Sequence, residues 1–317
     1  MADPELSRAA ATTVDCLGAS PGESFLVAYN PELAAVATAI AEAARAVGCT
    51  VAACEYAPTT RNGEEPPEEV ARALLVADAA AIVTRYSVSH TLARLEATKR
   101  GVRIASMPDM TADIFRRCVP TDYAHLENRC RALAERLTAA SSCRIVSAAG
   151  TDVRLVLAGR SGRSDDGDLR TPGAFGNLPA GEAYISPIET EGEGVIVFDG
   201  SVASSGLLER PLRVELSGGR AVTAGGEGAD VFLETLDAGG PNGRVVAELG
   251  IGTNPAAGIH GRIIEDEKAE GTIHVAFGTN TGIGGVNQAA VHIDGVVRNP
   301  TVDLDGETIM RNGNLAG

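Results

Sequence analysis

Short apolar runs alternate with helical stretches through the first 140 residues. The apolar runs at residues 24–28, 50–54, 79–84 and 102–105 are typical of buried strands. Helical periodicity marks the stretches between and after them, at residues 31–47, 68–77, 89–100, 112–117 and 122–140. This alternation predicts an α/β domain with a parallel sheet and helices on its faces. No GxGxxG sequence opens any of these helices, so a dinucleotide site has no support.

The pattern changes near Ser141, where glycine becomes frequent and helical periodicity disappears. Turn residues separate short segments of alternating apolar and polar residues, at 143–147, 152–157, 194–199, 212–216, 245–249, 272–277, 290–293 and 297–304. Such spacing is typical of a largely antiparallel β domain, a sandwich or a curved sheet. We therefore expect two domains, an α/β domain at residues 1–140 and a β-rich domain at residues 141–317.

The composition limits the classes of partner. Lysine and arginine number 27 against 42 aspartates and glutamates, which gives a net charge of −15 in 317 residues. Nucleic acids and anionic membranes reward clustered Lys and Arg, so we expect this chain to bind neither. Aromatic residues make up only 3% and tryptophan is absent, so the core must be built from Ala, Val, Leu and Ile.

Six cysteines lie in the first half of the chain, and none forms a CxxC pair. Their apolar surroundings predict small buried thiols in a reducing compartment. The N-terminus lacks a basic region followed by an apolar core, so no signal peptide is apparent. No apolar run has the roughly 18 to 20 residues that span a bilayer. These features predict a cytoplasmic protein.

The stretch from Glu248 to Asp294 holds three of the five histidines and concentrates the candidate chemistry. His274 and His292 lie in alternating runs typical of strands, and His292 is two residues from Asp294. Residues i and i+2 of a strand share a face, so this imidazole and this carboxylate point together. Glycines around both runs let the backbone come close to a bound group. We expect a metal site built on strands.

Two glutamates extend this candidate site. Glu248 lies inside an otherwise apolar run, where an ionised carboxylate is costly unless it is paired or bound to a metal. Glu182 opens a strand after the tight-turn sequence GNLPAG. Each acid alone could be an exposed strand residue, and His274 alone could be a satisfied interior histidine. Together these oxygen and nitrogen ligands suit Zn, Mn, Co or Fe(II), and three carboxylates could hold two adjacent ions.

Other polar groups are weaker candidates for the functional site. His90 follows the third predicted strand, at the strand end where open α/β sheets place binding sites. It could act as a general acid or base, or it could simply face solvent. The acidic run IEDEKAE at residues 264–270 lacks the ligand spacing of an EF-hand, so we interpret it as a solvated turn. No GxSxG sequence supports a nucleophilic hydrolase.

The C-terminal half resembles the M29 metallopeptidases, of the aminopeptidase T or S type, and the related 2,5-dihydroxypyridine ring-cleaving dioxygenases. The resemblance rests on GNLPAGEAYISP, AELGIGTNP, EDEKAEGTIHVAFG and the HID sequence at 292–294, in the order that the family has them. The first half matches only in its general layout and in RYSVSHT. The resemblance implies a homo-oligomer and metal ligands at Glu182, Glu248, His274, His292 and Asp294. It also points to a base at His90, because the dioxygenases have a histidine in that stretch.

The segment GTNTGIGGVNQ at residues 278–288 departs from the peptidases, which carry a tyrosine ligand in a longer insertion there. The dioxygenases also have an NT..GG run at this point, so Asn280 and Thr281 are candidate substrate-binding residues. Those dioxygenases hold one Fe(II) with two His and one Asp. They have histidine at the position of Glu248 and apolar residues at those of Glu182 and His274. The chain thus combines peptidase-type ligands with a segment of dioxygenase length.

We expect a metal-dependent hydrolase in which one or two divalent ions activate water to cleave a peptide or amide bond of a small molecule or short peptide. Glu248 would be catalytic, with His90, and would bridge or anchor the ions. His292 and Asp294 would hold one of them. The alternative is an Fe(II)-dependent dioxygenase of an N-heteroaromatic or phenolic ring. A third alternative, a non-catalytic binding protein with the same fold, would have no use for five ligand-type residues.

Overall fold

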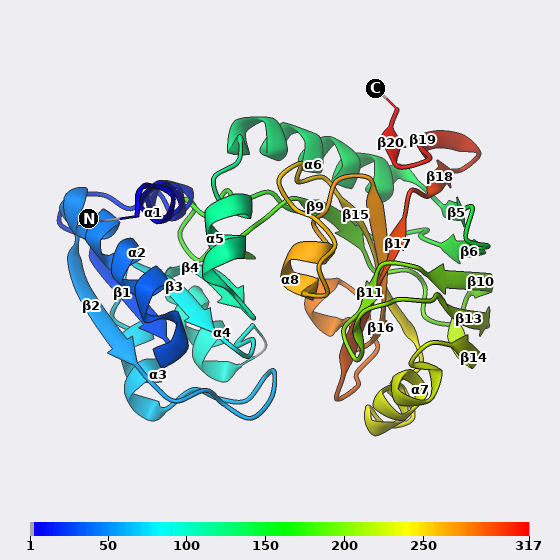
Figure 1. Cartoon of the computed structure of the whole chain (residues 1–317), viewed down its shortest axis with the longest axis horizontal. Helices are drawn as coiled ribbons and strands as arrows, with labels where there is room; N and C mark the ends of the chain where they lie inside the picture. The colour runs from blue at the N-terminus through cyan, green and yellow to red at the C-terminus, as the bar shows by residue number, and fades with distance from the viewer. Residues whose placement is uncertain (1–2, 90, 317) are drawn as a thin grey trace. The chain divides into compact units, whose positions relative to one another are not determined.

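The structure is a computed structural model that describes residues 3–89 and 91–316. It forms two compact units, one of Met1–Tyr123 with Gly167–Ala180 and one of Ala124–Asp166 with Gly181–Gly317. The division lies earlier than residue 140 because the last helix of the predicted α/β region joins the core of the second unit. A short segment then returns to the first unit before the chain continues in the second (Figure 1).

A parallel sheet with strand order β2-β1-β3-β4-β8 forms the centre of the first unit. Every residue of β3 is buried, as a central strand covered on both faces requires. The four predicted strands are confirmed with small shifts of their ends, as β1 (Ser24–Tyr29), β2 (Thr50–Glu55), β3 (Ala79–Thr84) and β4 (Arg103–Pro108).

The fifth strand, β8 (Phe175–Asn177), comes from a distant part of the chain, and the sequence does not predict it. Ile104 of β4 pairs with Phe175, and Ser106 pairs with Asn177. Three residues are too few for apolar periodicity to indicate a strand. Its extended backbone therefore depends on the pairing with β4.

Helices connect the strands of the first unit. The sequence does not predict the first of them, whose N-terminus is capped because the Asp3 carboxylate accepts hydrogen bonds from the backbone N–H groups of Glu5 and Leu6. The others lie where helical periodicity predicts them. The set comprises α1 (Pro4–Cys16), the short 3₁₀ helix η1 (Pro31–Leu33), α2 (Ala34–Ala46), α3 (Glu68–Leu74), α4 (Leu92–Lys99) and α5 (Ala112–Cys118).

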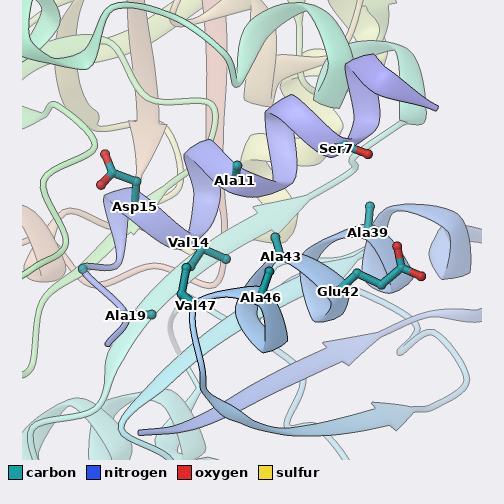
Figure 2. A pocket seen from close by; sticks show the side chains of 11 residues that line it. Ser7, Ala11, Val14, Asp15, Ala19, Ala39, Glu42, Ala43, Ala46 and Val47 are labelled. Atoms are coloured by element: carbon teal, nitrogen blue, oxygen red, sulfur yellow. The ribbon is translucent and has the colours of Figure 1, made fainter. Parts of the chain in front are cut away.

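A pocket opens between α1 and α2, and Figure 2 shows it from close by. Alanine side chains of both helices, such as Ala11 and Ala43, are among the residues that line it. The carboxylates of Asp15 and Glu42 extend from α1 and α2 respectively (Figure 2). The lining includes none of the candidate metal ligands.

Two antiparallel sheets form most of the second unit. The first has the strand order β14-β13-β10-β6-β5-β18-β19-β20. Figure 1 shows β5, β6, β10, β13 and β14 following one another in this order. Its strands are β5 (Ser142–Val146), β6 (Asp152–Val156), β10 (Gly192–Phe198), β13 (Leu212–Ser217), β14 (Arg220–Gly226), β18 (Thr301–Leu304), β19 (Glu307–Arg311) and β20 (Asn314–Leu315).

The second sheet has the strand order β12-β11-β17-β16-β15-β9-β7, and every residue of its central strands β15 and β16 is buried. All its pairings are antiparallel. Its strands are β7 (Arg163–Asp165), β9 (Glu182–Ile185), β11 (Ser201–Val202), β12 (Gly206–Leu207), β15 (Val246–Gly252), β16 (Thr272–Gly278) and β17 (His292–Arg298).

One hydrophobic core joins the two sheets. Ile145 and Leu155 of the first sheet belong to the same cluster as Leu249 and Val275 of the second. The helix α6 (Tyr123–Ala139) contributes Leu137 to this cluster. The predicted fold class is thus confirmed, with a parallel-sheet α/β part and a largely antiparallel β-rich part.

The second half contains more helix than the sequence pattern predicts. α7 (Ala229–Ala238) and the short α8 (Ile263–Asp266) both lie in the second half. Phe232 and Leu236 of α7 are buried and four residues apart, so they share one helix face. Two such positions in ten residues give too weak a periodic signal to distinguish a helix from neighbouring strands.

The last predicted strands also end differently. Instead of breaking near residue 294, β17 runs from His292 to Arg298, and β18 begins at Thr301. Asn299 adopts a left-handed φ of 46° and precedes Pro300, so these two residues make the turn between the strands.

The cysteines behave as the composition predicts. None of the six, all of which lie among the described residues, forms a disulfide, and all except Cys54 are buried. In the part of the chain that the structure describes, no helix is both long and apolar enough to cross a membrane.

Three phenylalanines lie at the centre of the second unit, so its core is not built from Ala, Val, Leu and Ile alone, and they should contribute to its stability. Phe198, Phe232 and Phe277 are fully buried and meet edge to face, with ring centroids 5.5 to 6.5 Å apart. We expect Phe232→Ala to lower the free energy of unfolding by about 3 to 5 kcal/mol, because it leaves a cavity among these rings. Urea denaturation followed by circular dichroism measures this loss.

The matched control is Val231→Ala, one residue away in the same helix, where the side chain is 49% exposed. Its effect should stay within about 0.5 kcal/mol. Equal effects of the two substitutions would show that the aromatic cluster does not stabilise the unit.

Candidate metal centre

Strand register places the predicted ligands on one face of the second sheet. His274 of β16 pairs with Gly250 of β15, and Ala276 pairs with Asp294 of β17. Directly opposed residues of antiparallel strands project on the same side, as do residues two apart in one strand. The shared face therefore carries Glu182, Glu248, His274, His292 and Asp294. The opposite face carries Leu249, Ile251, Ile273, Val275 and Phe277, which belong to the core.

Small residues make room for the polar side chains on this face. A Cβ atom at Gly250 would lie only 2.0 Å from Cε1 of His274, so the imidazole packs directly over the glycine backbone. Between Val246 and Glu248 the register of β15 shifts by one residue against β16. Beyond this bulge the register is regular, and Glu248 pairs with Ala276, two residues from His274, so Glu248 lies on the same face as His274.

Glu248 lies between the two imidazoles. Its Oε1 is 3.4 Å from Nε2 of His274, and its Oε2 is 3.4 Å from Nε2 of His292. His274 Nε2 is also 3.3 Å from Oε2 of Glu182, and His292 Nε2 is 3.5 Å from Oδ1 of Asp294. One carboxylate thus connects a Glu182–His274 pair to a His292–Asp294 pair.

The backbone fixes the orientation of His292. Its Nδ1 donates a hydrogen bond of 2.8 Å to the carbonyl oxygen of Thr279, which leaves Nε2 to face the carboxylates. The His292 side chain is 26% exposed, whereas that of His274 is 1% exposed. The site is therefore accessible on the His292 side.

The crowded charges shift the pKa values of the central groups. Burial raises the pKa of Glu248, but its hydrogen bonds with His274 and His292 outweigh burial and hold the pKa well below its ordinary value. Burial lowers the pKa of His274, but the carboxylates of Glu182 and Glu248 outweigh it and raise this pKa to about 9. Burial raises the pKa of Glu182 to about 7, against the opposing effects of Lys268 and His274.

The interpretation of residues 264–270 as a solvated turn is wrong. Glu265, Asp266 and Lys268 are each 0% exposed. The Asp266 carboxylate accepts hydrogen bonds from the backbone N–H groups of His260 and Gly261, and its neighbour Glu265 accepts one from Gly258. These backbone donors replace water, so the charged run folds inward instead of facing solvent.

The run also adds two groups to the site that the sequence does not predict. One oxygen of Glu267 lies within 4.8 Å of ligand atoms of His274 and Asp294. The Lys268 ammonium contacts the carboxylates of Glu182 and Glu267 at 2.5 and 2.7 Å. In the sequence, Glu267 and Lys268 are adjacent and come shortly before the buried strand β16. This is the signal that could have indicated both groups.

These side chains fit a divalent metal ion. Ligand atoms of Glu182, Glu248 and His274 all lie within 4.8 Å of one another, as do those of Glu267, His274 and Asp294. Oε2 of Glu182 is buried without a hydrogen-bond partner among the described residues, although it faces His274. A buried acceptor of this kind is costly unless a cation binds it. Carboxylate oxygens with imidazole nitrogens are the donors that Zn, Mn, Co and Fe(II) bind.

The remaining predicted residues lie elsewhere. Asn280 is 1% exposed, and its amide group donates to Ser186 and Glu189 and accepts from the N–H of Asn287. This amide holds the segment after β16 in place, while Thr281 is exposed at the start of the 3₁₀ helix η2 (Thr281–Ile283). Their contact with substrate stays a prediction. His90 lies outside the described residues.

Comparisons with known proteins agree with the resemblance seen in the motifs. A family model for 2,5-dihydroxypyridine 5,6-dioxygenase (NicX) matches residues 16–317. A solved 2,5-dihydroxypyridine dioxygenase from Pseudomonas putida KT2440 is similar, with a TM-score of 0.84 and 20% identity over 98% of this chain and 97% of that one. Wild-type AmpT from Thermus thermophilus is similar, with a TM-score of 0.75 and 20% identity over 99% of each chain.

No curated protein sequence matches the chain. At 20% identity the two solved structures show a shared fold, whereas the family model spans almost the whole sequence. The suspected relationship to the joint group of aminopeptidase T-type proteins and dihydroxypyridine dioxygenases is confirmed, and the chain belongs to the 2,5-dihydroxypyridine 5,6-dioxygenase (NicX) family of enzymes.

Proposed function

We propose that the protein is a metal-dependent hydrolase that cleaves a peptide or amide bond of a small molecule or short peptide. The observation that carries this proposal is the position of Glu248 between His274 and His292, with Glu182 and Asp294 at the two ends. A central carboxylate with an acid and an imidazole on each side suits one or two ions that activate water.

The bound metal would lower the pKa of a coordinated water and polarise the scissile carbonyl. The protein's own groups would prepare the site for that chemistry. Glu248 stays ionised because its pKa is depressed, so it keeps both imidazoles oriented. The Thr279 carbonyl holds the His292 ring, as carbonyl groups commonly do for ligating histidines. Burial raises the pKa of Glu267, although the adjacent Lys268 ammonium acts in the opposite direction.

The second candidate is an Fe(II)-dependent dioxygenase of an N-heteroaromatic or phenolic ring. The match of the dioxygenase family model to residues 16–317 favours it. His274, His292 and Asp294 also supply the two imidazoles and one carboxylate that non-haem Fe(II) oxygenases use. Against it, Glu182 and Glu248 add two carboxylates that this ligand set does not need.

Activity with defined metals separates the two candidates. Protein stripped of metal and reloaded with Zn, Mn or Co should hydrolyse aminoacyl p-nitroanilides. Oxygen consumption with 2,5-dihydroxypyridine, measured on anaerobically loaded Fe(II) protein, tests the dioxygenase. Inertness with all three hydrolase metals together with Fe(II)-dependent oxygen uptake would reject the proposed hydrolase.

Glu248→Gln should weaken both metal binding and turnover. The substitution removes a negative charge from between the two imidazoles while it keeps the size of the side chain. We expect metal affinity and kcat/KM each to fall by about 10-fold to 100-fold. Elemental analysis after dialysis and steady-state kinetics measure them. Glu307→Gln, at an exposed glutamate of β19, is the control and should retain both properties.

Metal affinity should increase with pH. Glu182, with a pKa of about 7, and His274, with a pKa of about 9, both hold protons that a metal ion must displace. Raising the pH through these values removes the competing protons, so affinity rises by up to about tenfold per pH unit for each proton displaced. Competition with a chelating dye at a series of pH values measures the slope. A flat profile from pH 7 to pH 9 is the contrary result.

A further inference from the structure

The ammonium group of Lys268 is fully enclosed by the protein. The residue is 0% exposed, and its Nζ lies 2.5 Å from Oε1 of Glu182, 2.7 Å from Oε1 of Glu267 and 3.5 Å from Oδ2 of Asp165. A buried cation without partners is strongly destabilising. The Lys268 ammonium can therefore be buried only because these three carboxylates surround it. They also raise its pKa well above the ordinary value, although burial acts in the opposite direction.

The contact with Lys268 distinguishes the two oxygens of Glu182. Oε1 accepts the hydrogen bond from the ammonium. Oε2 has no hydrogen-bond partner among the described residues and lies 3.3 Å from Nε2 of His274. One oxygen is therefore occupied by the lysine, and the other is directed at the cluster of candidate ligands.

The backbone around Lys268 leaves little freedom to this arrangement. Its carbonyl accepts a hydrogen bond of 2.8 Å from the N–H of Asn254, and its own N–H donates to the carbonyl of Glu265. A Cβ atom at Gly252 would lie 2.2 Å from the carbonyl oxygen of Ala269, so the segment packs directly on β15. The Lys268 side chain therefore reaches the candidate ligands from a backbone position that is held in place.

We propose that Lys268 is a positioning residue that restricts Glu182 to one-oxygen coordination of the metal and ties Glu267 to the same centre. The ammonium occupies Oε1, so Oε2 alone is offered as a ligand. Without the lysine, both oxygens of Glu182 could bind the ion and raise its coordination number. The inference rests on the metal centre of the proposed function, and it holds for either hydrolase or dioxygenase chemistry.

Cobalt(II) reports this difference directly, because its visible absorption weakens as the coordination number rises. Lys268→Met removes the charge and keeps an unbranched side chain. Loaded with Co(II), this variant should show a weaker and shifted visible band than the unaltered protein. A spectrum identical to that of the unaltered protein would overturn the inference while leaving the metal centre intact. Failure of the unaltered protein to bind Co(II), Zn or Mn would overturn both.

The control is Arg103→Met, which removes another buried cation far from these ligands in the sequence. Arg103 is 7% exposed and pairs with Glu23 at 2.7 Å in the first unit. Its loss should lower the thermal unfolding temperature without changing the Co(II) spectrum. A spectral change in this control equal to that of Lys268→Met would assign the effect to general destabilisation and reject a specific role for the lysine.

Lys268→Met leaves buried carboxylates with less positive charge, so a charge-matched variant guards against failure to fold. The double substitution Lys268→Met with Asp165→Asn removes one positive and one negative charge together. Compared with Asp165→Asn alone, it should show the same weakening of the Co(II) band. Identical spectra of these two variants would overturn the inference, whatever the fate of the single lysine variant.

Discussion

The register of four antiparallel strands is the constraint on which the candidate site depends. β9, β15, β16 and β17 present apolar side chains to the core on one face and the polar cluster on the other. Because side chains alternate along a strand, a slip of one residue would exchange the two faces. The core therefore fixes the register, and the register places His274 opposite Gly250, where the only side-chain atom of the partner is hydrogen. Packing and site formation are thus consequences of a single arrangement.

The second physical problem is the concentration of negative charge on that polar face. Asp165, Glu182, Glu248, Glu267 and Asp294 lie in one region with Lys268 and two imidazoles as their nearby cationic partners. Buried carboxylates remain stable only when positive charge or hydrogen-bond donors replace water. Lys268 compensates the negative charges of Glu182 and Glu267, and the two imidazoles compensate that of Glu248. A divalent ion would complete this compensation, so metal binding and the stability of the second unit should be coupled.

Strand periodicity and the unusual placement of Glu248 were sufficient to predict the β-rich part and the five side chains that the structure brings together. Two limits explain what the sequence did not reveal. The segments α7 and β8 are short, so their structure depends on partners far away in the chain. The run around Lys268 is charged, and charge predicts exposure unless the partners are known. Those partners, the backbone N–H groups of residues 258–261 and the carboxylate of Glu182, are set only by the tertiary fold.

In this protein, family membership establishes the fold but does not by itself identify the reaction. The fold is common to a solved 2,5-dihydroxypyridine dioxygenase and to AmpT, each at 20% identity, so the fold alone does not select a reaction. The side chains on the polar face are what can distinguish one reaction from the other. A carboxylate at Glu248, where the dioxygenases resembled here have histidine, places negative charge between the two imidazoles. That charge adds an oxygen ligand beside the two imidazoles, and oxygen ligands favour harder divalent ions such as Mn(II) that activate water. This carboxylate is the basis on which we propose hydrolysis, although the matching family model is that of a dioxygenase.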